Sequence, residues 1–282
     1  MQRVVYGWLT CIICLLGYLP ASGQGDMLIF PKRVVFEGRK NTEMVNLTNT
    51  GSDTATYHLS FIQMRMDENG RLEPITGPDT SSYFADPYIR YYPRIVTLAP
   101  QESQLIKLQT FKTGSLAPGE YRSHLYIRAD PSHKPGEATG EDAQYIEEPG
   151  AISIRLIPMY GLTIPCIIRI GESTTSVTMS NLALERDSTS GSFFLKLDLH
   201  RHGNMSAYGH FFITHQAPDG TITTVARLKG IGVYTPGTLR RCKIRLSQSD
   251  SIDYSSGKLL AVYSAHEIRS VPIAQAELDL SH

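Results

Sequence analysis

The feature of this sequence that most restricts its fold is a long succession of short apolar runs. After residue 26, runs of about four to eight residues rich in Val, Ile, Tyr, Phe and Thr alternate with clusters of Gly, Pro, Asn and Asp. Such runs are typical of β-strands, and the clusters between them are typical of turns. No long segment shows the periodicity of an amphipathic helix. The sequence therefore predicts an all-β protein.

The runs fall into two sets, which indicates two domains. The first set is spaced as in a β-sandwich. It comprises 27–36, 43–48, 56–66, 88–98, 103–109, 120–128 and 151–164. The second set comprises 166–170, 176–184, 193–200, 210–215, 221–228, 239–246, 258–264 and 273–280. Because no Ser/Gly-rich linker separates the sets, we expect two sandwiches at a fixed angle, the N-terminal one over 24–164 and the C-terminal one over 165–282.

The segment 1–23 has the composition of a secretory signal peptide. Arg3 supplies a positively charged start, an apolar stretch follows over 8–19, and small residues at 21–23 suit cleavage. An apolar stretch of this length is short for a membrane-spanning helix. We therefore expect an exported mature chain, and an uncleaved N-terminal anchor is the alternative.

Charge and motifs exclude several classes of function. The 27 basic and 27 acidic residues balance, so the chain lacks the basic excess that is typical of nucleic-acid-binding proteins. The sequence contains no G-x-S-x-G, H-E-x-x-H or phosphate-binding glycine motif. We therefore expect no enzyme activity, no cofactor and no metal site.

Histidines and cysteines leave two weaker possibilities open. His200 and His202 would share one face of a strand and could ligate a metal, although surface histidines explain the pair as well. Cys166 and Cys242 are the only cysteines after the expected leader. In an oxidising compartment they could form a disulfide within the second domain, or they could remain two buried thiols.

The run 151–164 differs from the others in length and pattern. Ile152, Ile154 and Leu156 share one face, because successive side chains of a strand point to opposite sides, and the same apolar phase continues to the end of the run. This ridge can belong to an ordinary core strand, or it can be offered to another polypeptide by β-strand addition. The preceding polar segment 131–149 is long for a loop in a compact sandwich, which makes a functional or disordered segment the natural interpretation.

Several stretches of the chain resemble the periplasmic pilus-assembly chaperones of the PapD-like family. They are KRVVFEG (32–38), VNLTN (45–49), YYPRIVTLAPQESQLIKL (91–108), LAPGEYRSHLYIRA (116–129) and AISIRL (151–156). They follow the order of the family and cover most of 27–164, and 200–214 and 230–241 resemble the second domain of outlying members. The resemblance implies a periplasmic, non-enzymatic protein with two immunoglobulin-like β-sandwiches arranged as a boomerang.

The resemblance also implies a function and a set of site residues. Chaperones of this family bind pilus or fimbrial subunits that lack their last strand, lend them an edge strand, and deliver them to an usher-like platform in the outer membrane. Arg33 matches the family's arginine that anchors the C-terminal carboxylate of the subunit, and Ile152, Ile154 and Leu156 match the donor side chains. The family's anchoring lysine does not carry over, since counting along the donor strand puts Gly161 there, and Arg155 or Lys32 could substitute for it.

Two further possibilities follow from the exposed ridge and the two-domain organisation. A second copy of the chain could cap the ridge when no subunit is bound, which would give a dimer. Alternatively, the chain could be a two-domain immunoglobulin-like adhesive or structural protein of the cell envelope. That alternative would bury the ridge within its own sheet, so the ridge is the feature that separates the two hypotheses.

Overall fold

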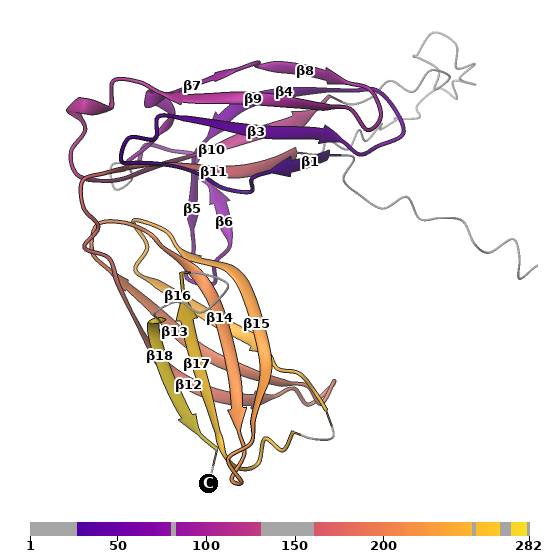
Figure 1. The fold of residues 1–282 in the computed structure, drawn as a ribbon, viewed down its shortest axis with the longest axis vertical. Helices are drawn as coiled ribbons and strands as arrows, with labels where there is room; N and C mark the ends of the chain where they lie inside the picture. The colour runs from indigo at the N-terminus through magenta and orange to yellow at the C-terminus, as the bar shows by residue number, and fades with distance from the viewer. Residues whose placement is uncertain (1–26, 80–82, 131–160, 250–251, 266–271, 281–282) are drawn as a thin grey trace, which may run out of the picture.

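The computed structural model describes residues 27–79, 83–130, 161–249, 252–265 and 272–280 (Figure 1). Nearly all of these residues are in strands or in the turns between them, which confirms the all-β prediction. Two short 3-10 segments, η1 (Asp86–Tyr88) and η2 (Thr113–Ser115), interrupt the strands. Within the described ranges, no helix is long and apolar enough to cross a membrane. The expected signal peptide, 1–23, lies outside them.

The first sandwich packs two sheets around one core (Figure 1). One sheet, in the order β1-β3-β9-β7, contains β1 (Met27–Phe30), β3 (Thr42–Asn49), β9 (Ser103–Thr110) and β7 (Ile89–Tyr92). The other, in the order β2-β11-β10-β4-β8, contains β2 (Val34–Glu37), β11 (Gly161–Ile170), β10 (Gly119–Ala129), β4 (Ala55–Ile62) and β8 (Ile95–Leu98). Leu47 and Leu108 from one sheet and Leu125 from the other are fully buried between them, because alternate positions of each strand face inward.

The second sandwich has its own two sheets and its own core. The smaller sheet, in the order β12-β13-β16, contains β12 (Ser176–Arg186), β13 (Phe193–His202) and β16 (Leu239–Arg245). The larger, in the order β15-β14-β17-β18, contains β15 (Ile222–Val233), β14 (Ala207–Gln216), β17 (Lys258–Ser264) and β18 (Pro272–Asp279). Leu197, Phe211 and Tyr263 are buried between them. The prediction of two β-sandwiches is therefore confirmed.

The first run expected from the sequence, 27–36, forms two strands instead of one. β1 pairs with β3 in one sheet, and β2 pairs with β11 in the other. The chain therefore changes sheets at 31–33, which places Arg33 immediately before β2. The run 56–66 divides in the same way, into β4 and a short strand, β5 (Met64–Met66).

The boundary between the sandwiches lies later than the sequence indicates. The boundary expected at residue 164 falls within β11, and all of β11 pairs inside the first sandwich, with β10 and with β2. The next strand, β12, begins at Ser176. Pro165 lies within β11 although proline donates no hydrogen bond to a ladder. The strand nevertheless continues through it, since Ile164 and Cys166 on either side are buried in the first core.

A hairpin joins the two sandwiches at a second point. β5 pairs with β6 (Leu72–Pro74), and Figure 1 shows this hairpin extending from the first sandwich toward the second. Met66 is buried in the second core. At the turn, the backbone N–H of Arg241 donates to the carbonyl oxygen of Glu68 (2.6 Å), and the two side chains form an ion pair (2.6 Å). The sandwiches meet at an angle, as in a boomerang (Figure 1).

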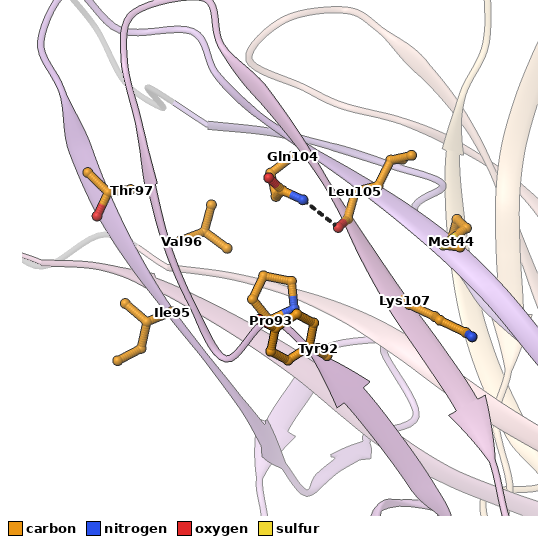
Figure 2. Close-up of a pocket in the computed structure, with 9 residues that line it drawn as sticks. All are labelled: Met44, Tyr92, Pro93, Ile95, Val96, Thr97, Gln104, Leu105 and Lys107. Carbon is orange, nitrogen blue, oxygen red and sulfur yellow. Dashed lines mark hydrogen bonds between the residues drawn. The ribbon is translucent and has the colours of Figure 1, made fainter.

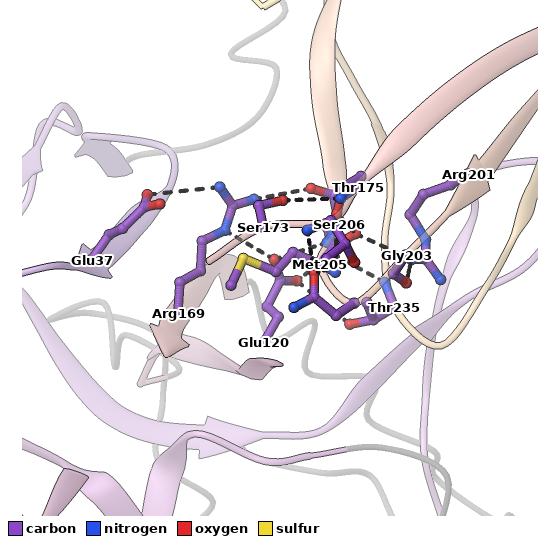
Figure 3. A network of polar contacts seen from close by, with 12 residues as sticks. Glu37, Glu120, Arg169, Ser173, Thr175, Arg201, Gly203, Met205, Ser206 and Thr235 are labelled. Carbon is purple, nitrogen blue, oxygen red and sulfur yellow. Dashed lines mark hydrogen bonds and ion pairs between the residues drawn. The ribbon is translucent and has the colours of Figure 1, made fainter. Parts of the chain in front are cut away.

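A buried polar network also fixes this junction (Figure 3). The carboxylate of Glu120 on β10 accepts hydrogen bonds from the backbone N–H of Ser206 (3.0 Å), from the Ser206 hydroxyl, and from Arg169 Nε (3.2 Å). Arg169 on β11 also donates to the carbonyl oxygen of Ser206 (2.9 Å). Because Ser206 immediately precedes β14, the network ties two strands of the first sandwich to the second. We call these three residues the Glu120 network.

The cysteines and histidines take positions that the sequence left open. Cys166 lies in the first core and Cys242 lies on β16 of the second sandwich, and both are free thiols. The disulfide alternative is therefore wrong, because the two cysteines belong to different sandwiches. His200 and His202 do share β13, but His200 is hydrogen-bonded to the hydroxyl of Ser180 (2.7 Å). The described residues contain no cluster of three or more potential metal ligands.

Candidate functional site

In the described part of the chain, one edge of β11 has no neighbouring strand along 161–165, and this free edge ends at Arg33. β2 runs parallel to β11 and pairs with it only along 166–169. The first pair of this ladder is Val34 with Cys166, so Arg33 lies one residue earlier, level with Pro165 on β11. Pro165 in turn pairs with His124 on β10. Along 161–165, β11 therefore has β10 on one side and, in the part of the chain that the structure describes, no strand on the other.

The alternate apolar side chains of β11 are no longer buried in the first core from Leu162 toward the start of the strand. Ile164 is buried in that core, whereas Leu162, two residues earlier on the same face, is 40% exposed. The expected donor residues Ile152, Ile154 and Leu156 have the same parity as Leu162, but they lie outside the described residues. The role of these three side chains therefore stays a prediction.

Arg33 has a desolvated guanidinium. Its Nε and Nη2 are buried, and neither has a hydrogen-bond partner. The guanidinium carbon lies 4.3 Å from the ring centroid of Tyr208 and 6.0 Å from that of Tyr234, both in the second sandwich. Burial lowers the pKa of Arg33 from its ordinary value, but an arginine side chain in a protein keeps its proton. The two aromatic rings offset part of the cost of removing this charge from water.

Arg122 and His124 on β10 lie beside Arg33. Arg122 is 7% exposed, and its Nη2 donates to the carbonyl oxygen of Met64 (3.3 Å) while its Nη1 has no partner. Its guanidinium carbon lies 4.6 Å from the ring centroid of Tyr234. Neither ring nitrogen of His124 has a partner, and burial together with the charge of Arg122 lowers the pKa of His124 to about 3. His124 is therefore neutral at pH 7.

This arrangement can bind an anion. Buried guanidinium N–H groups without acceptors cost free energy, which an incoming acceptor would recover. The nearby carboxylate of Glu120 is already bonded to Ser206 and Arg169. A carboxylate fits the planar fork of an arginine through two parallel charge-assisted hydrogen bonds. The end of the β11 edge is therefore chemically suited to hold a carboxylate at Arg33.

Gly161 is not beside Arg33. It pairs with Arg128 at the start of β11, and the ring of Tyr126 lies where a Cβ at this position would be. No side chain fits at 161 unless Tyr126 moves. The position on β11 beside Arg33 is Pro165, which carries no charge either. Counting along the strand from the donor residues does not identify the neighbour of Arg33, because only the pairing with β2 fixes which residue lies next to it.

Sequence reasoning identified Arg33 but missed Arg122, His124, Glu120 and Arg169. A signal was present, because polar and apolar residues alternate along GEYRSHLYIRA. A strand with such alternation normally turns its polar face to water. Here the second sandwich covers that face, and nothing in the local pattern of one strand reveals a cover that comes from a distant part of the chain.

A second surface feature is a shallow hollow on the first sandwich, beside β3, β9 and the β7–β8 turn (Figure 2). Its volume is about 400 Å³, and its lining includes Met44, Tyr92, Ile95, Leu105 and a single cation, Lys107. Tyr92 is 77% exposed. Exposed apolar residues gathered in one place are typical of a protein contact surface.

Comparison with known proteins gives no match at the level of sequence families and many matches among solved structures. No protein-family model matches the chain, and no curated protein matches it. The chain is similar to the YadV chaperone, with 12% identity, a TM-score of 0.43, and coverage of 91% of this chain and 100% of that chain. It is similar to the class 5 fimbriae chaperone CfaA, with 13% identity, a TM-score of 0.41, and coverage of 91% and 99%.

A third similar structure is the CsuC–CsuE chaperone–tip adhesion subunit pre-assembly complex from the archaic chaperone-usher Csu pili of Acinetobacter baumannii. The identity is 14%, the TM-score is 0.40, and the similarity covers 90% of this chain and 98% of that chain. Identities and TM-scores this low do not assign a function, so the function has to be argued from the site itself.

Proposed function

We propose that this chain is a periplasmic chaperone that binds incomplete pilus or fimbrial subunits by lending them a strand, and that delivers them for assembly at the outer membrane. One observation carries the proposal. Among the described residues, the edge of β11 along 161–165 is unpaired and ends at Arg33, whose buried Nε and Nη2 have no partner. A strand added at this edge would gain main-chain hydrogen bonds along β11 and a charged anchor at its end.

The position of β2 favours one direction for the added strand. β2 runs parallel to β11 on the same side as the free edge. A strand added in line with β2 has to stop where β2 begins, which is at Arg33. If the added strand is parallel to β11, the end that stops there is its C-terminus, and its carboxylate meets the guanidinium. An antiparallel strand would bring a positively charged N-terminus to Arg33, which is electrostatically unfavourable.

The donor side chains in this proposal are Ile152, Ile154 and Leu156. They continue the apolar phase that leaves the first core at Leu162. At about 25 cal/mol per Å², burial of three aliphatic side chains contributes roughly 5 kcal/mol before ordering costs are subtracted. The ridge would supply affinity, and the bond from Arg33 to the terminal carboxylate would fix the register of the added strand.

The proposed activity involves no covalent chemistry and no nucleotide. A lent strand packs less well in the subunit than the strand that finally replaces it. Part of the folding free energy of the subunit is therefore withheld until assembly, and the exchange of one strand for the other then runs downhill. The chaperone acts as a transient part of the subunit's sandwich, not as a catalyst.

The test is a pull-down of the tagged mature protein from the host periplasm, followed by mass spectrometry, with Ile154→Asp in parallel. We expect the wild type to retain a small β-rich secreted subunit and Ile154→Asp to lose it, while circular dichroism and thermal unfolding stay unchanged. Ile222→Asp is the matched control, because Ile222 is 66% exposed on β15 of the second sandwich. This control should retain the subunit.

Three outcomes would contradict the proposal. If Ile154→Asp unfolds the protein, Ile154 belongs to the core of the chain itself and is not a donor residue. If both forms retain the same partner, or neither retains any, the ridge is not the binding surface. A two-domain adhesive or structural protein of the cell envelope is then the better hypothesis, and glycan binding is the next measurement.

Capping of the ridge by a second copy of the chain would appear as a dimer of the wild type that Ile154→Asp abolishes.

A further inference from the structure

We propose that Arg122 is the second cation that holds the bound carboxylate, and that Tyr234 of the second sandwich positions it together with Arg33. This inference rests on the proposed function, because it concerns the same site. It assigns a role to a residue that the family pattern does not supply, since both candidate positions on β11, Gly161 and Pro165, are uncharged.

The first argument is that Arg122 brings a buried guanidinium with an unsatisfied N–H group into the junction. Its side chain is 7% exposed and its Nη1 has no hydrogen-bond partner. Its Nη2 bond to the carbonyl oxygen of Met64, at 3.3 Å, is long and involves a neutral acceptor. A buried guanidinium in this condition is stabilised strongly by any carboxylate that reaches it, because the cost of desolvation has already been met by the fold.

The second argument is position. Side chains two residues apart on a strand point to the same side, so Arg122 lies on the face of His124, and His124 is in the row of Arg33. Both guanidinium carbons approach the ring of Tyr234, that of Arg122 at 4.6 Å and that of Arg33 at 6.0 Å from its centroid. The negative face of an aromatic ring attracts a cation, so Tyr234 supports two like charges that would otherwise repel each other.

The third argument is that the other charged groups of the junction are engaged. Arg169 is bonded to Glu120, and Arg201 donates to backbone carbonyl oxygens, among them that of Gly203 (2.7 Å). His124 is neutral. Among the buried cations of the junction that the structure describes, Arg122 is therefore the one left to assist Arg33. The ring of Tyr208 lies over the guanidinium of Arg33 from the second sandwich.

The test compares two peptides, both N-acetylated strands of alternating valine and threonine. One peptide ends in a free carboxylate and the other in an amide. The full mature chain is used as wild type, Arg33→Gln, Arg122→Gln and Arg122→Lys. Arg90→Gln is the matched control, because Arg90 is an exposed arginine that also lies over an aromatic ring, 4.2 Å from the centroid of Phe111. Calorimetric titration gives each affinity, and the ratio of the two affinities reports recognition of the carboxylate.

We expect the wild type and Arg90→Gln to prefer the free carboxylate by about tenfold or more, as a charge-assisted hydrogen bond allows. Arg33→Gln and Arg122→Gln should each bring the ratio close to one. Arg122→Lys should give an intermediate ratio, because it keeps the charge but loses the fork. If Arg122→Gln does not fold, the ratio of peptide affinities in Arg122→Lys tests the inference instead.

The outcomes separate this inference from the proposed function. If Arg122→Gln weakens both peptides equally and leaves the ratio at its wild-type value, Arg122 only supports the fold. The inference is then overturned while Arg33 remains the anchor. If the wild type does not prefer the free carboxylate, or if Arg33→Gln keeps that preference, Arg33 does not anchor a carboxylate. The anchor then has to be removed from the proposed function as well as from this inference.

Discussion

Two polar clusters lie at the junction of the sandwiches, and they differ in whether their buried groups are paired. In the Glu120 network, the carboxylate faces Arg169 and accepts from Ser206 (Figure 3). In the cluster of Arg33, Arg122 and His124, three guanidinium nitrogens and two imidazole nitrogens have no partner. These five atoms are all the buried unpartnered side-chain nitrogen and oxygen atoms found among the described residues.

Paired and unpaired buried groups can have different roles within one junction. Native interiors pair nearly all of their buried polar groups, so unpaired groups gathered at one place call for an explanation. The paired cluster stabilises the angle between the sandwiches. In our proposal, the unpaired cluster lowers the stability of the fold and raises its affinity for an anion.

Glu120→Gln should have the largest effect on stability. The change leaves the partly buried guanidinium of Arg169 without its main counter-charge, since Glu37 is exposed and 3.8 Å away. Removal of one partner of a buried ion pair costs about 3 kcal/mol or more. Urea denaturation measures the free energy of unfolding. The control is Glu185→Gln, whose carboxylate pairs with Lys196 at the surface, and this change should be indistinguishable from wild type. Equal effects at both sites would contradict the assigned role of the network.

Stability should also fall in acid because of His124. The pKa of His124 is about 3 in the folded chain and 6.5 when unperturbed, so between these values the unfolded chain binds a proton that the folded chain does not. Stability from this group is complete above pH 6.5 and declines as the pH falls, by about 2 kcal/mol at pH 5. Urea unfolding at several pH values should show a shallower decline in His124→Leu. Identical slopes for the two proteins would exclude His124 as the source.

Arg33→Gln should change stability little, in contrast to Glu120→Gln. The guanidinium of Arg33 has no hydrogen bond to lose, and burial of its charge is unfavourable. We expect the free energy of unfolding to stay within about 1 kcal/mol of wild type or to rise. The same urea experiment decides the point. A loss as large as that of Glu120→Gln would mean that Arg33 supports the fold, and the two clusters would then not differ in role.

The smallest effect concerns Cys166, on the opposite face of β11 from this cluster. Cys166 and Cys242 are free thiols, so a reductant should leave the thermal unfolding midpoint unchanged. Burial raises the pKa of Cys166 to about 12, so the folded protein should react slowly with a thiol reagent at this position. Denatured mature chain should show both thiols. A midpoint that drops on reduction would reveal a disulfide and contradict the assignment of the two cysteines to separate cores.

Much of the fold follows from the sequence because alternation and turn residues act locally. Every run expected from 176 onward overlaps a strand, and so do all runs between 27 and 128. The errors occur where a distant segment decides the outcome. Pro165 lies within β11 because residues on either side of it are buried by the first core, and the run 27–36 divides because its two halves pair with different sheets.

The candidate site was accessible to sequence reasoning only in part. Arg33 came from a resemblance, and its position at the end of a free edge came from the structure. Arg122 and His124 look like ordinary surface residues of an alternating strand. They become a site because Tyr208 and Tyr234, which lie far along the chain, close over them. Burial that one domain imposes on another is a tertiary property, and it leaves no periodic signal in the buried strand.

The hairpin of β5 and β6 has a mechanical consequence for the molecule. The chain crosses the junction between β11 and β12, and the hairpin crosses it again at a separate place, where Glu68 contacts Arg241. Contacts at two separated points leave the sandwiches free to rotate only about the line between those points, and the Glu120 network adds a third contact at the junction. The angle between the two sandwiches is therefore constrained. A polypeptide that binds along β11 has to fit within that angle.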